Sequence, residues 1–565
     1  MSWRRMKGVD MVKSPLVLLA VMVVVVAVFA APAPLPGDVL KTIDLPVSTP
    51  TGLAWDGEAF WVADYDTAAL YRISPSDGKV LTKVEAPGYA PLSLAWDGSR
   101  LWCLDEADKT AYAYDPISKR TVRALALDTQ SPEGIAWDGK DLWVSDPQSG
   151  VIAKLDEEDG TTFRSFPSPR KGHGTGMTWD GNYLWAADRS SDRIYQIDPV
   201  SGWVVNFFDS PGPYTSGLAW DGRNLWCCDY EKRTLAKLAV SPSPLYVNYD
   251  PKREKVVYSE AWTNFGPGTV KSLDVYLAVP QDLPNQKIES EPVYEPKPVD
   301  FVTDQWGQRF AHFLFKDIKS GQEARAKMTV NVTVKRVRYF IDPKAVGGLE
   351  DIPEDIRHAY LADASKLQLH DPVIQKAVKE AVGGEANPYW IAQKINRYVQ
   401  EKMHYELAGG WNIAPVVLER GSGSCSEYSF VMIALCRAAG LPARYAGSVV
   451  IRGDDASRDD VFHRWVEVYL PNFGWVPVDP SGGDSPLVED QAKYFGGLDN
   501  RFLITTQGGG DSQYLGWDYN SSASWTAEGR VKLMQRKAGE WFPVGKSYAA
   551  RAVGEAGGLT CKPGP

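Results

Sequence analysis

The segment GLAWDGEAFWVAD, residues 52–64, decides the fold of the N-terminal part of the chain, because close copies of it recur. Its Trp-Asp-Gly tripeptide appears five times, at intervals of 41 or 42 residues: at Trp55, Trp96, Trp137, Trp179 and Trp220. Each copy continues through short apolar alternations separated by Asp-Gly and Pro turns, which predicts four strands per repeat. Four strands in a repeat of about 41 residues are typical of a propeller blade.

The phase of the repeats predicts how the ring closes. The fifth copy ends at TLAKLAV (234–240) without a fourth strand, whereas an unassigned strand, VLKTIDLP (39–46), precedes the first copy. We therefore expect an all-β five-bladed propeller over residues 38–240, with the N-terminal strand completing the last blade. The repeats resemble those of NHL-like and lyase-like propellers. Their tryptophans, two per repeat, are expected to be core residues rather than a platform for a ligand.

The next two regions differ in their periodicity. Residues 245–340 alternate apolar and polar side chains without a helical segment, which predicts a β-sandwich. From Ile352 onward the period becomes helical, most clearly in YWIAQKINRYVQEKM (389–403). A helical region that follows two β regions indicates a multidomain protein.

A cysteine in the helical region has the setting of a nucleophile. In GSGSCSEYSFVMIALCRAAGLP (421–442) a Gly/Ser-rich loop precedes Cys425, and an almost wholly apolar segment follows it. Such a segment predicts a buried helix with Cys425 at its N-terminus. There the free amides and the helix dipole favour the thiolate, which is the reactive form.

A hairpin downstream offers the base and the orienting carboxylate that a thiolate nucleophile needs. His463 begins HRWVEVYL, and Asp479 lies in the following GWVPVDPSGG. Because side chains alternate between the faces of a strand, these two can meet only if the paired residue numbers sum to an even value. The predicted register therefore places Tyr469 opposite Trp475, with a five-residue loop.

Three blocks of this region resemble the transglutaminase-like superfamily, whose fold is α+β and related to papain: SGSCSEYSFVMIALCRAAGLPAR, HRWVEVYLPNFGW and VPVDPS. The resemblance implies a catalytic domain over residues 350–485. It also implies that Cys425 is the nucleophile, His463 the general base and then acid, and Asp479 the residue that orients the imidazole. No cofactor and no metal are implied.

The resemblance does not assign two features. The first is the side chain that donates to the oxyanion, for which Trp411 and Gln393 are candidates in addition to the backbone amide of Cys425. The second is position 464, where many relatives have a small residue and this chain has Arg464. We expect Arg464 to face away from the site, so that Arg464→Ala leaves activity nearly unchanged.

The two ends of the chain carry their own signals. Basic residues precede an apolar run over residues 16–31, so segment 1–31 is interpreted as a signal peptide or a membrane anchor. Either alternative predicts an extracytoplasmic protein, secreted or anchored to the outer face of the membrane. Residues 486–565 are expected to form a C-terminal β extension and a disordered tail.

The charge of the chain bears on its partners. The net charge is −10, and the segment from Pro36 to Val240 contains 30 acidic and 20 basic residues. An acidic propeller repels phosphate backbones, so we expect no nucleic-acid partner, whereas a protein partner on the propeller remains open.

These features together predict a thiol enzyme that acts on amide bonds of proteins or peptides through an acyl-enzyme. Hydrolysis, as by a cysteine peptidase or amidase, is the first expectation. The alternatives are transglutaminase-type crosslinking, and a non-catalytic propeller scaffold with a decayed docking domain.

Overall fold

A computed structural model gives the fold and describes residues 34–172, 174–240, 245–407 and 410–545. The predicted signal or anchor segment 1–31 and the predicted tail after residue 545 lie outside the described residues. Among the helices in the described ranges, none is long and apolar enough to cross a membrane.

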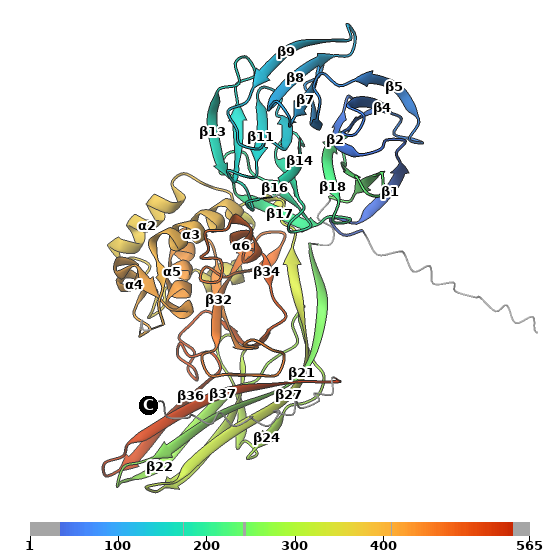
Figure 1. Ribbon diagram of the computed structural model, residues 1–565. Helices are drawn as coiled ribbons and strands as arrows, with labels where there is room; N and C mark the ends of the chain where they lie inside the picture. The colour runs from blue at the N-terminus through green and yellow to red at the C-terminus, as the bar shows by residue number, and fades with distance from the viewer. Residues whose placement is uncertain (1–33, 173, 241–244, 408–409, 546–565) are drawn as a thin grey trace, which may run out of the picture. The chain divides into compact units, whose positions relative to one another are not determined.

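Each of the five repeats forms a four-stranded antiparallel sheet (Figure 1). The first contains β2 (Pro50–Trp55), β3 (Phe60–Asp64), β4 (Ala69–Ile73) and β5 (Val80–Glu85). The second contains β6 (Pro91–Trp96), β7 (Leu101–Asp105), β8 (Thr110–Asp115) and β9 (Arg120–Ala126). The third contains β10 (Gly134–Trp137), β11 (Leu142–Asp146), β12 (Val151–Leu155) and β13 (Thr162–Pro167). The fourth contains β14 (Gly174–Trp179), β15 (Leu184–Asp188), β16 (Arg193–Ile197) and β17 (Val204–Asp209). The fifth contains β18 (Thr215–Trp220), β19 (Leu225–Asp229), β20 (Thr234–Leu238) and β1 (Val39–Asp44).

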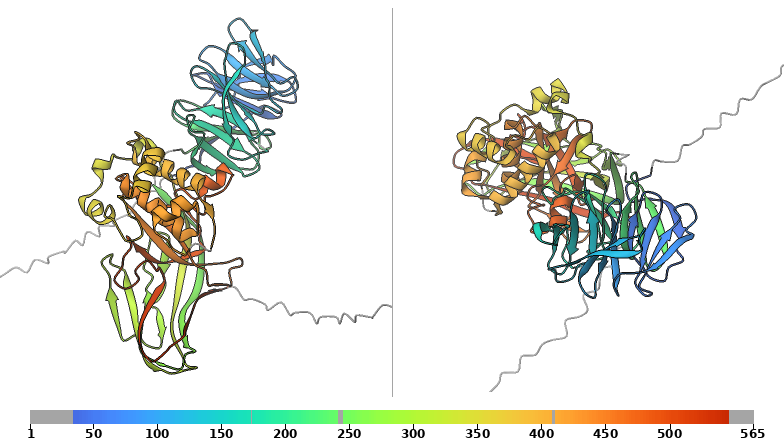
Figure 2. Two further views of the ribbon diagram at one scale, coloured as in Figure 1. Left: turned by 90° about the vertical axis from the view of Figure 1, so that its left-hand side faces the viewer. Right: turned by 90° about the horizontal axis from the view of Figure 1, so that it is seen from above.

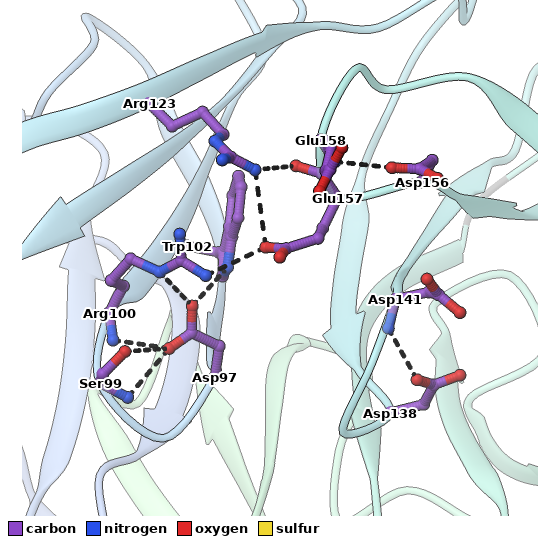
Figure 3. Close-up of polar contacts among 10 residues, drawn as sticks. All are labelled: Asp97, Ser99, Arg100, Trp102, Arg123, Asp138, Asp141, Asp156, Glu157 and Glu158. Atoms are coloured by element: carbon purple, nitrogen blue, oxygen red, sulfur yellow. Dashed lines mark hydrogen bonds and ion pairs between the residues drawn. The ribbon is translucent and has the colours of Figure 1, made fainter.

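The Trp-Asp-Gly tripeptide builds the same turn in every repeat. Asp56 accepts a hydrogen bond from the Ala59 amide at 2.8 Å and another from Trp61 Nε1 at 3.0 Å, while Gly57 supplies the positive φ of +98° that the turn requires. The tryptophan-to-aspartate bond recurs at 2.7–3.0 Å, as Figure 3 shows for the second repeat: Trp102–Asp97, Trp143–Asp138, Trp185–Asp180 and Trp226–Asp221.

The tryptophans are core residues, as predicted. The second tryptophan of each repeat is buried, and the first is half-buried and packs against the same apolar clusters. Arg100 and Arg123 add polar contacts between neighbouring sheets, because both reach Glu157 of the third repeat (Figure 3).

The N-terminal strand completes the last sheet, which confirms that part of the prediction. β1 pairs antiparallel with β20, with Ile43 opposite Leu235. The first strands of consecutive sheets contact one another, and β18 contacts β2. Hydrogen bonds reinforce these contacts, for example from Ser216 Oγ to the Pro50 carbonyl at 2.8 Å. The approach is close: a Cβ on Gly217 would lie 2.7 Å from the Leu53 nitrogen.

Residues 246–339 form two antiparallel sheets of longer strands that share one apolar core. The first sheet contains β23 (Gln286–Ile288), β27 (Glu323–Tyr339), β21 (Tyr246–Asn264), β37 (Leu533–Pro543) and β31 (Ser457–Asp459), with β24 (Val293–Glu295) and β34 (Gly497–Leu498) also paired to β27. The second contains β25 (Asp300–Thr303), β26 (Arg309–Ile318), β22 (Thr269–Ala278) and β36 (Ser521–Glu528).

The segment after residue 485, which we predicted as a separate β extension, supplies strands to sheets formed mainly by earlier parts of the chain. β37 pairs with β21 and β36 pairs with β22. Figures 1 and 2 show these orange-red strands among the green and yellow ones. The long apolar alternations of β21 and β22 thus have partners on both sides.

The helical region surrounds one central helix. The helices are α1 (Glu354–Tyr360), α2 (Pro372–Val382), α3 (Pro388–Lys402), α4 (Ala414–Arg420), α5 (Cys425–Ala438) and α6 (Val488–Lys493), with the 3-10 turns η1 (Pro343–Ala345) and η2 (Leu349–Asp351). Their sheet contains β33 (Gly474–Val478), β32 (His463–Leu470), β30 (Ala443–Val450) and β35 (Phe502–Gly508), and β28 (His404–Tyr405) pairs in parallel with β29 (Ser422–Gly423). α5 contacts α2, α3 and α4 as well as β30 and β32 (Figure 1), so its apolar sequence is buried on all sides.

Candidate active site

The loop before α5 holds Cys425 in place as the first residue of the helix. Glu427, which is fully buried, accepts hydrogen bonds from the Ser424 amide at 3.1 Å and from Arg420 Nη2 at 2.8 Å. It also accepts one from the Asn412 amide at 3.3 Å. A buried carboxylate with three donors fixes the loop, and with it the position of the thiol.

The hairpin has a register in which paired residue numbers sum to an even value, so His463 and Asp479 lie on the same face. Tyr469 lies opposite Trp475, which confirms the prediction, and Val466 lies opposite Val478. Leu470 also pairs with Gly474, so the turn itself is three residues rather than five. The paired numbers still sum to an even value.

Cys425, His463 and Asp479 lie together at the start of α5, as predicted. His463 Nε2 lies 2.6 Å from Asp479 Oδ2, and the thiol of Cys425 hydrogen-bonds the imidazole. Asp479 Oδ1 accepts two further bonds, from Ser481 Oγ at 2.9 Å and from the Gly482 amide at 2.8 Å. With Nε2 held by the carboxylate, Nδ1 is the ring nitrogen left for the sulfur.

The electrostatics of the three residues favour a thiolate–imidazolium pair. Burial on its own raises the pKa of Cys425, but the hydrogen bond and charge of His463 and the backbone amide of Arg464 bring it below its ordinary value. Burial likewise lowers the pKa of His463, and the charge of Asp479 and its hydrogen bond overcome this and raise it. The net directions are opposite, as an ion pair requires.

Tyr405 is a site residue that the sequence analysis missed. It lies on β28, opposite Gly423 of the loop that leads to the cysteine. The backbone amide of Cys425 acts on its hydroxyl and partly offsets the rise in the Tyr405 pKa that burial causes. The same amide is where the oxyanion of an acyl-transfer intermediate would bind. The two-residue pairing of β28 with β29 is too short to leave a periodic signal in the sequence.

The two candidates for the oxyanion donor have other partners. Gln393 is buried on α3, where its Nε2 donates to the Tyr389 hydroxyl at 3.1 Å. Trp411 packs its ring against Tyr519, with ring centroids 5.9 Å apart. Among the described residues, neither side chain makes a hydrogen bond or a ring contact with Cys425 or His463.

Arg464, which we expected to face away from the site, is a buried core residue. Its side chain is fully buried, and its guanidinium carbon lies 4.5–5.1 Å from the centroids of four rings: Trp411, Phe430, Tyr445 and Tyr519. Nη2 donates to the Trp517 carbonyl, and no carboxylate in the described ranges lies at ion-pair distance. Its charge attracts the Cys425 thiolate, and burial lowers the pKa of this arginine.

We therefore expect Arg464→Ala to destabilise the fold by about 3 kcal/mol, because it removes a large buried side chain from between aromatic rings. Arg464→Met keeps most of that volume and removes an unpaired buried charge, so its thermal midpoint should stay near wild type. The Met variant should nevertheless raise the pKa of the Cys425 thiol, measured by the pH dependence of alkylation. An Ala variant as stable as wild type would contradict this account of the arginine.

Within the part of the chain that the structure describes, no group of three or more His, Cys, Asp or Glu side chains is arranged to hold a metal ion.

Comparison with known proteins identifies the helical region. Residues 375–480 match the family model of the transglutaminase-like superfamily. An uncharacterized protein of Haemophilus influenzae is 27% identical over 168 residues, which are 24% of this chain and 45% of that protein. A protein-glutamine gamma-glutamyltransferase of Pseudomonas aeruginosa is 30% identical over 135 residues, 22% of this chain and 19% of that protein. The chain thus spans less than half the length of these relatives.

A solved structure from Cytophaga hutchinsonii, described as a "Putative Cysteine Protease", aligns with 53% of this chain and all of that one, at 16% identity and a TM-score of 0.38. The family match at residues 375–480 gives this region the fold of the cysteine-type acyltransferases and peptidases.

Proposed function

We propose that the protein is a thiol enzyme that cleaves amide bonds of proteins or peptides through an acyl-enzyme on Cys425. The observation that carries this proposal is the hydrogen-bonded chain from the Cys425 thiol through His463 to Asp479 at the N-terminus of a buried helix. The match of residues 375–480 to the transglutaminase-like superfamily supports it.

The geometry suggests the course of the reaction. The Cys425 thiolate attacks the amide carbonyl carbon, and the oxyanion is bound by the Cys425 amide. The His463 imidazolium then gives its proton to the leaving nitrogen as the C–N bond breaks, which leaves a thioester. Water, deprotonated by His463, attacks the thioester and releases the acid and the thiol. Asp479 holds the imidazole in orientation throughout.

Transfer to an amine is the second candidate. The Pseudomonas aeruginosa relative is named a protein-glutamine gamma-glutamyltransferase, and the same thioester can be attacked by a lysine amine instead of water. Hydrolysis and transfer share the same acyl-enzyme and differ in whether water or an amine attacks the thioester.

The test combines thiol reactivity with product analysis. In a Cys561→Ser background, which removes the cysteine outside the described residues, iodoacetamide at near-neutral pH should alkylate Cys425 selectively. Burial raises the pKa of Cys103, Cys227 and Cys436, and that of Cys228 to about 11. Casein incubated with a fluorescent primary amine should then give new N-termini if peptide bonds are hydrolysed, ammonia if side-chain amides are, or label if the amine is the acceptor. An unreactive Cys425 together with none of these products would favour the non-catalytic scaffold.

Tyr405→Phe tests the oxyanion hole. A substrate carbonyl would displace the hydroxyl from the Cys425 amide, and the displaced hydroxyl could then donate to the oxyanion. We expect kcat to fall by about 10²-fold with KM nearly unchanged. Because the side chain is 48% exposed, the thermal midpoint should not change. Tyr398→Phe is the matched control. It removes a hydroxyl on α3 that donates an exposed hydrogen bond to Glu380 on α2. A lower KM without loss of kcat would mean that Tyr405 only blocks the site.

For the architecture we propose three folding regions. The five sheets over residues 38–240 form a five-bladed propeller, supported by the contact of β18 with β2 and by the pairing of β1 with β20. The two sheets that share a core form a β-sandwich over residues 245–340, with strands added from the C-terminal segment. The catalytic region covers residues 350–485.

We also propose a location and a class of partner for the protein. The apolar run over residues 16–31 supports export, with either cleavage or anchoring, and hence a site of action outside the cytoplasm. The acidic propeller supports a protein or peptide partner rather than a nucleic acid.

A further inference from the structure

Two positions of the propeller repeat differ among the five copies, although their neighbours recur. The aspartate that ends the second strand is buried in every repeat: Asp64, Asp105, Asp146, Asp188 and Asp229. The residue directly after it varies: Tyr65, Glu106, Pro147, Arg189 and Tyr230. The residue four places before the Trp-Asp-Gly tryptophan varies as well: Thr51, Leu92, Glu133, Thr175 and Ser216. The residues at these two positions thus differ in charge and polarity from one repeat to the next, although Thr51 and Ser216 each donate a hydrogen bond to a carbonyl of a neighbouring strand.

The fold brings the variable positions together around one cavity. Eight of these residues line an open cavity of about 270 Å³ together with Thr49: Thr51, Tyr65, Leu92, Glu106, Glu133, Arg189, Ser216 and Tyr230. All five repeats therefore contribute to the lining. The third repeat contributes Glu133, which directly precedes β10. A pocket lined by the variable positions of a repeat has a chemical character that the repeat itself does not dictate.

Three of the lining side chains are charged, and two of them have no side-chain partner among the described residues. Glu106 accepts a hydrogen bond from the Tyr65 hydroxyl at 3.2 Å. The side chains of Glu133, which is half-buried, and Arg189, which is exposed, make no hydrogen bond or ion pair with another residue in the described ranges. Burial raises the pKa of Glu133 to about 7; the charge of Arg189 opposes that shift and the charge of Glu106 adds to it. The three groups thus influence one another across the cavity without neutralising each other by direct contact.

We propose that this cavity binds a zwitterionic amino acid, with its ammonium group at Glu106 and Glu133 and its carboxylate at Arg189. A simple amine would leave Arg189 unmatched and repelled, and a simple carboxylate would be repelled by the two glutamates. A zwitterion satisfies all three charges. The rings of Tyr65 and Tyr230 and the apolar side chain of Leu92 offer contacts for an uncharged side chain of the ligand. This inference is independent of the chemistry proposed at Cys425.

The test uses three probes that share a phenyl ring: phenylalanine, 2-phenylethylamine and 3-phenylpropionate. Binding to the full chain is measured by calorimetry in a Cys425→Ser background, so that no covalent chemistry contributes. We expect phenylalanine to bind at least about tenfold more tightly than the amine, and the acid to bind most weakly. Glu133→Gln and Arg189→Gln should each weaken phenylalanine binding by about tenfold or more.

Matched controls separate the cavity from general surface charge. Glu85→Gln and Arg120→Gln change exposed residues of the outer strands β5 and β9 and should leave binding unchanged. Thermal midpoints of all four variants should match, since the side chains of Glu133 and Arg189 make no hydrogen bond or ion pair with another described residue. Equal binding of phenylalanine and 2-phenylethylamine would overturn the zwitterion. Absence of binding by any standard amino acid would overturn the site.

Discussion

Cys425→Ser should abolish acyl transfer, lowering kcat by about 10⁴-fold or more while leaving the thermal midpoint unchanged. A serine hydroxyl at this position has nearly the volume of the thiol, but it does not ionise at neutral pH. The base at His463 is poised to form an ion pair with a sulfur whose pKa is already lowered, and an alkoxide would need far more driving force. The assay is single-turnover product formation with purified protein, alongside thermal denaturation.

Cys436→Ser is the matched control on the same helix. Cys436 is fully buried, eleven residues after Cys425, and burial raises its thiol pKa. The new hydroxyl should cost about 1 to 3 kcal/mol of stability, toward the lower end if it bonds a carbonyl of the preceding turn. The activity of the folded fraction should be retained. If both serine variants lost activity equally without unfolding, the nucleophile would be misassigned.

Asp479→Asn should lower kcat by about 10² to 10⁴-fold. The amide no longer stabilises the imidazolium, and its NH₂ group can hold the ring in the wrong tautomer. In the wild type, activity requires the thiolate and the imidazolium together, so it should rise above the lowered pKa of Cys425 and fall above the raised pKa of His463. Loss of the Asp479 charge lowers the pKa of His463, so the alkaline limb of kcat/KM should move to lower pH.

Asp484→Asn controls for the general effect of removing a nearby carboxylate. Asp484 accepts a hydrogen bond from the Tyr428 hydroxyl at 2.6 Å and does not contact His463. It should leave the alkaline limb where it is. An Asp479→Asn profile that coincides with the wild-type profile would show that this carboxylate does not set the protonation of the histidine.

The parts of the site that could be predicted from sequence depend on local patterns. The helix that begins at Cys425 is almost wholly apolar, which predicts that it is buried. The hairpin between His463 and Asp479 is short, so the alternation of side chains fixes its register by parity alone. The strands of the N-terminal repeats could be predicted for a similar reason, because the same Trp-Asp-Gly turn recurs in every copy.

The features that were missed depend on contacts between distant segments. The burial of Arg464 was missed because alternation predicts only the face that the side chain points to, not the four rings that surround it. Tyr405 lies on a strand of two residues, which has no period to detect. The pairing of β37 with β21 joins segments that lie far apart in the sequence, and nothing in either strand specifies its partner.

That pairing has a consequence for how the protein is made. A ribosome releases the chain from its N-terminus, so β21 and β22 emerge long before their partners β37 and β36 are synthesised. In the interval, each of the two sheets presents an open edge on which another nascent chain could add a strand. The two edges can be paired only after β36 and β37, which end at Glu528 and Pro543, have been synthesised. A chain truncated by premature termination would therefore keep those edges exposed, and quality-control factors that bind unpaired strands could distinguish it from the finished protein.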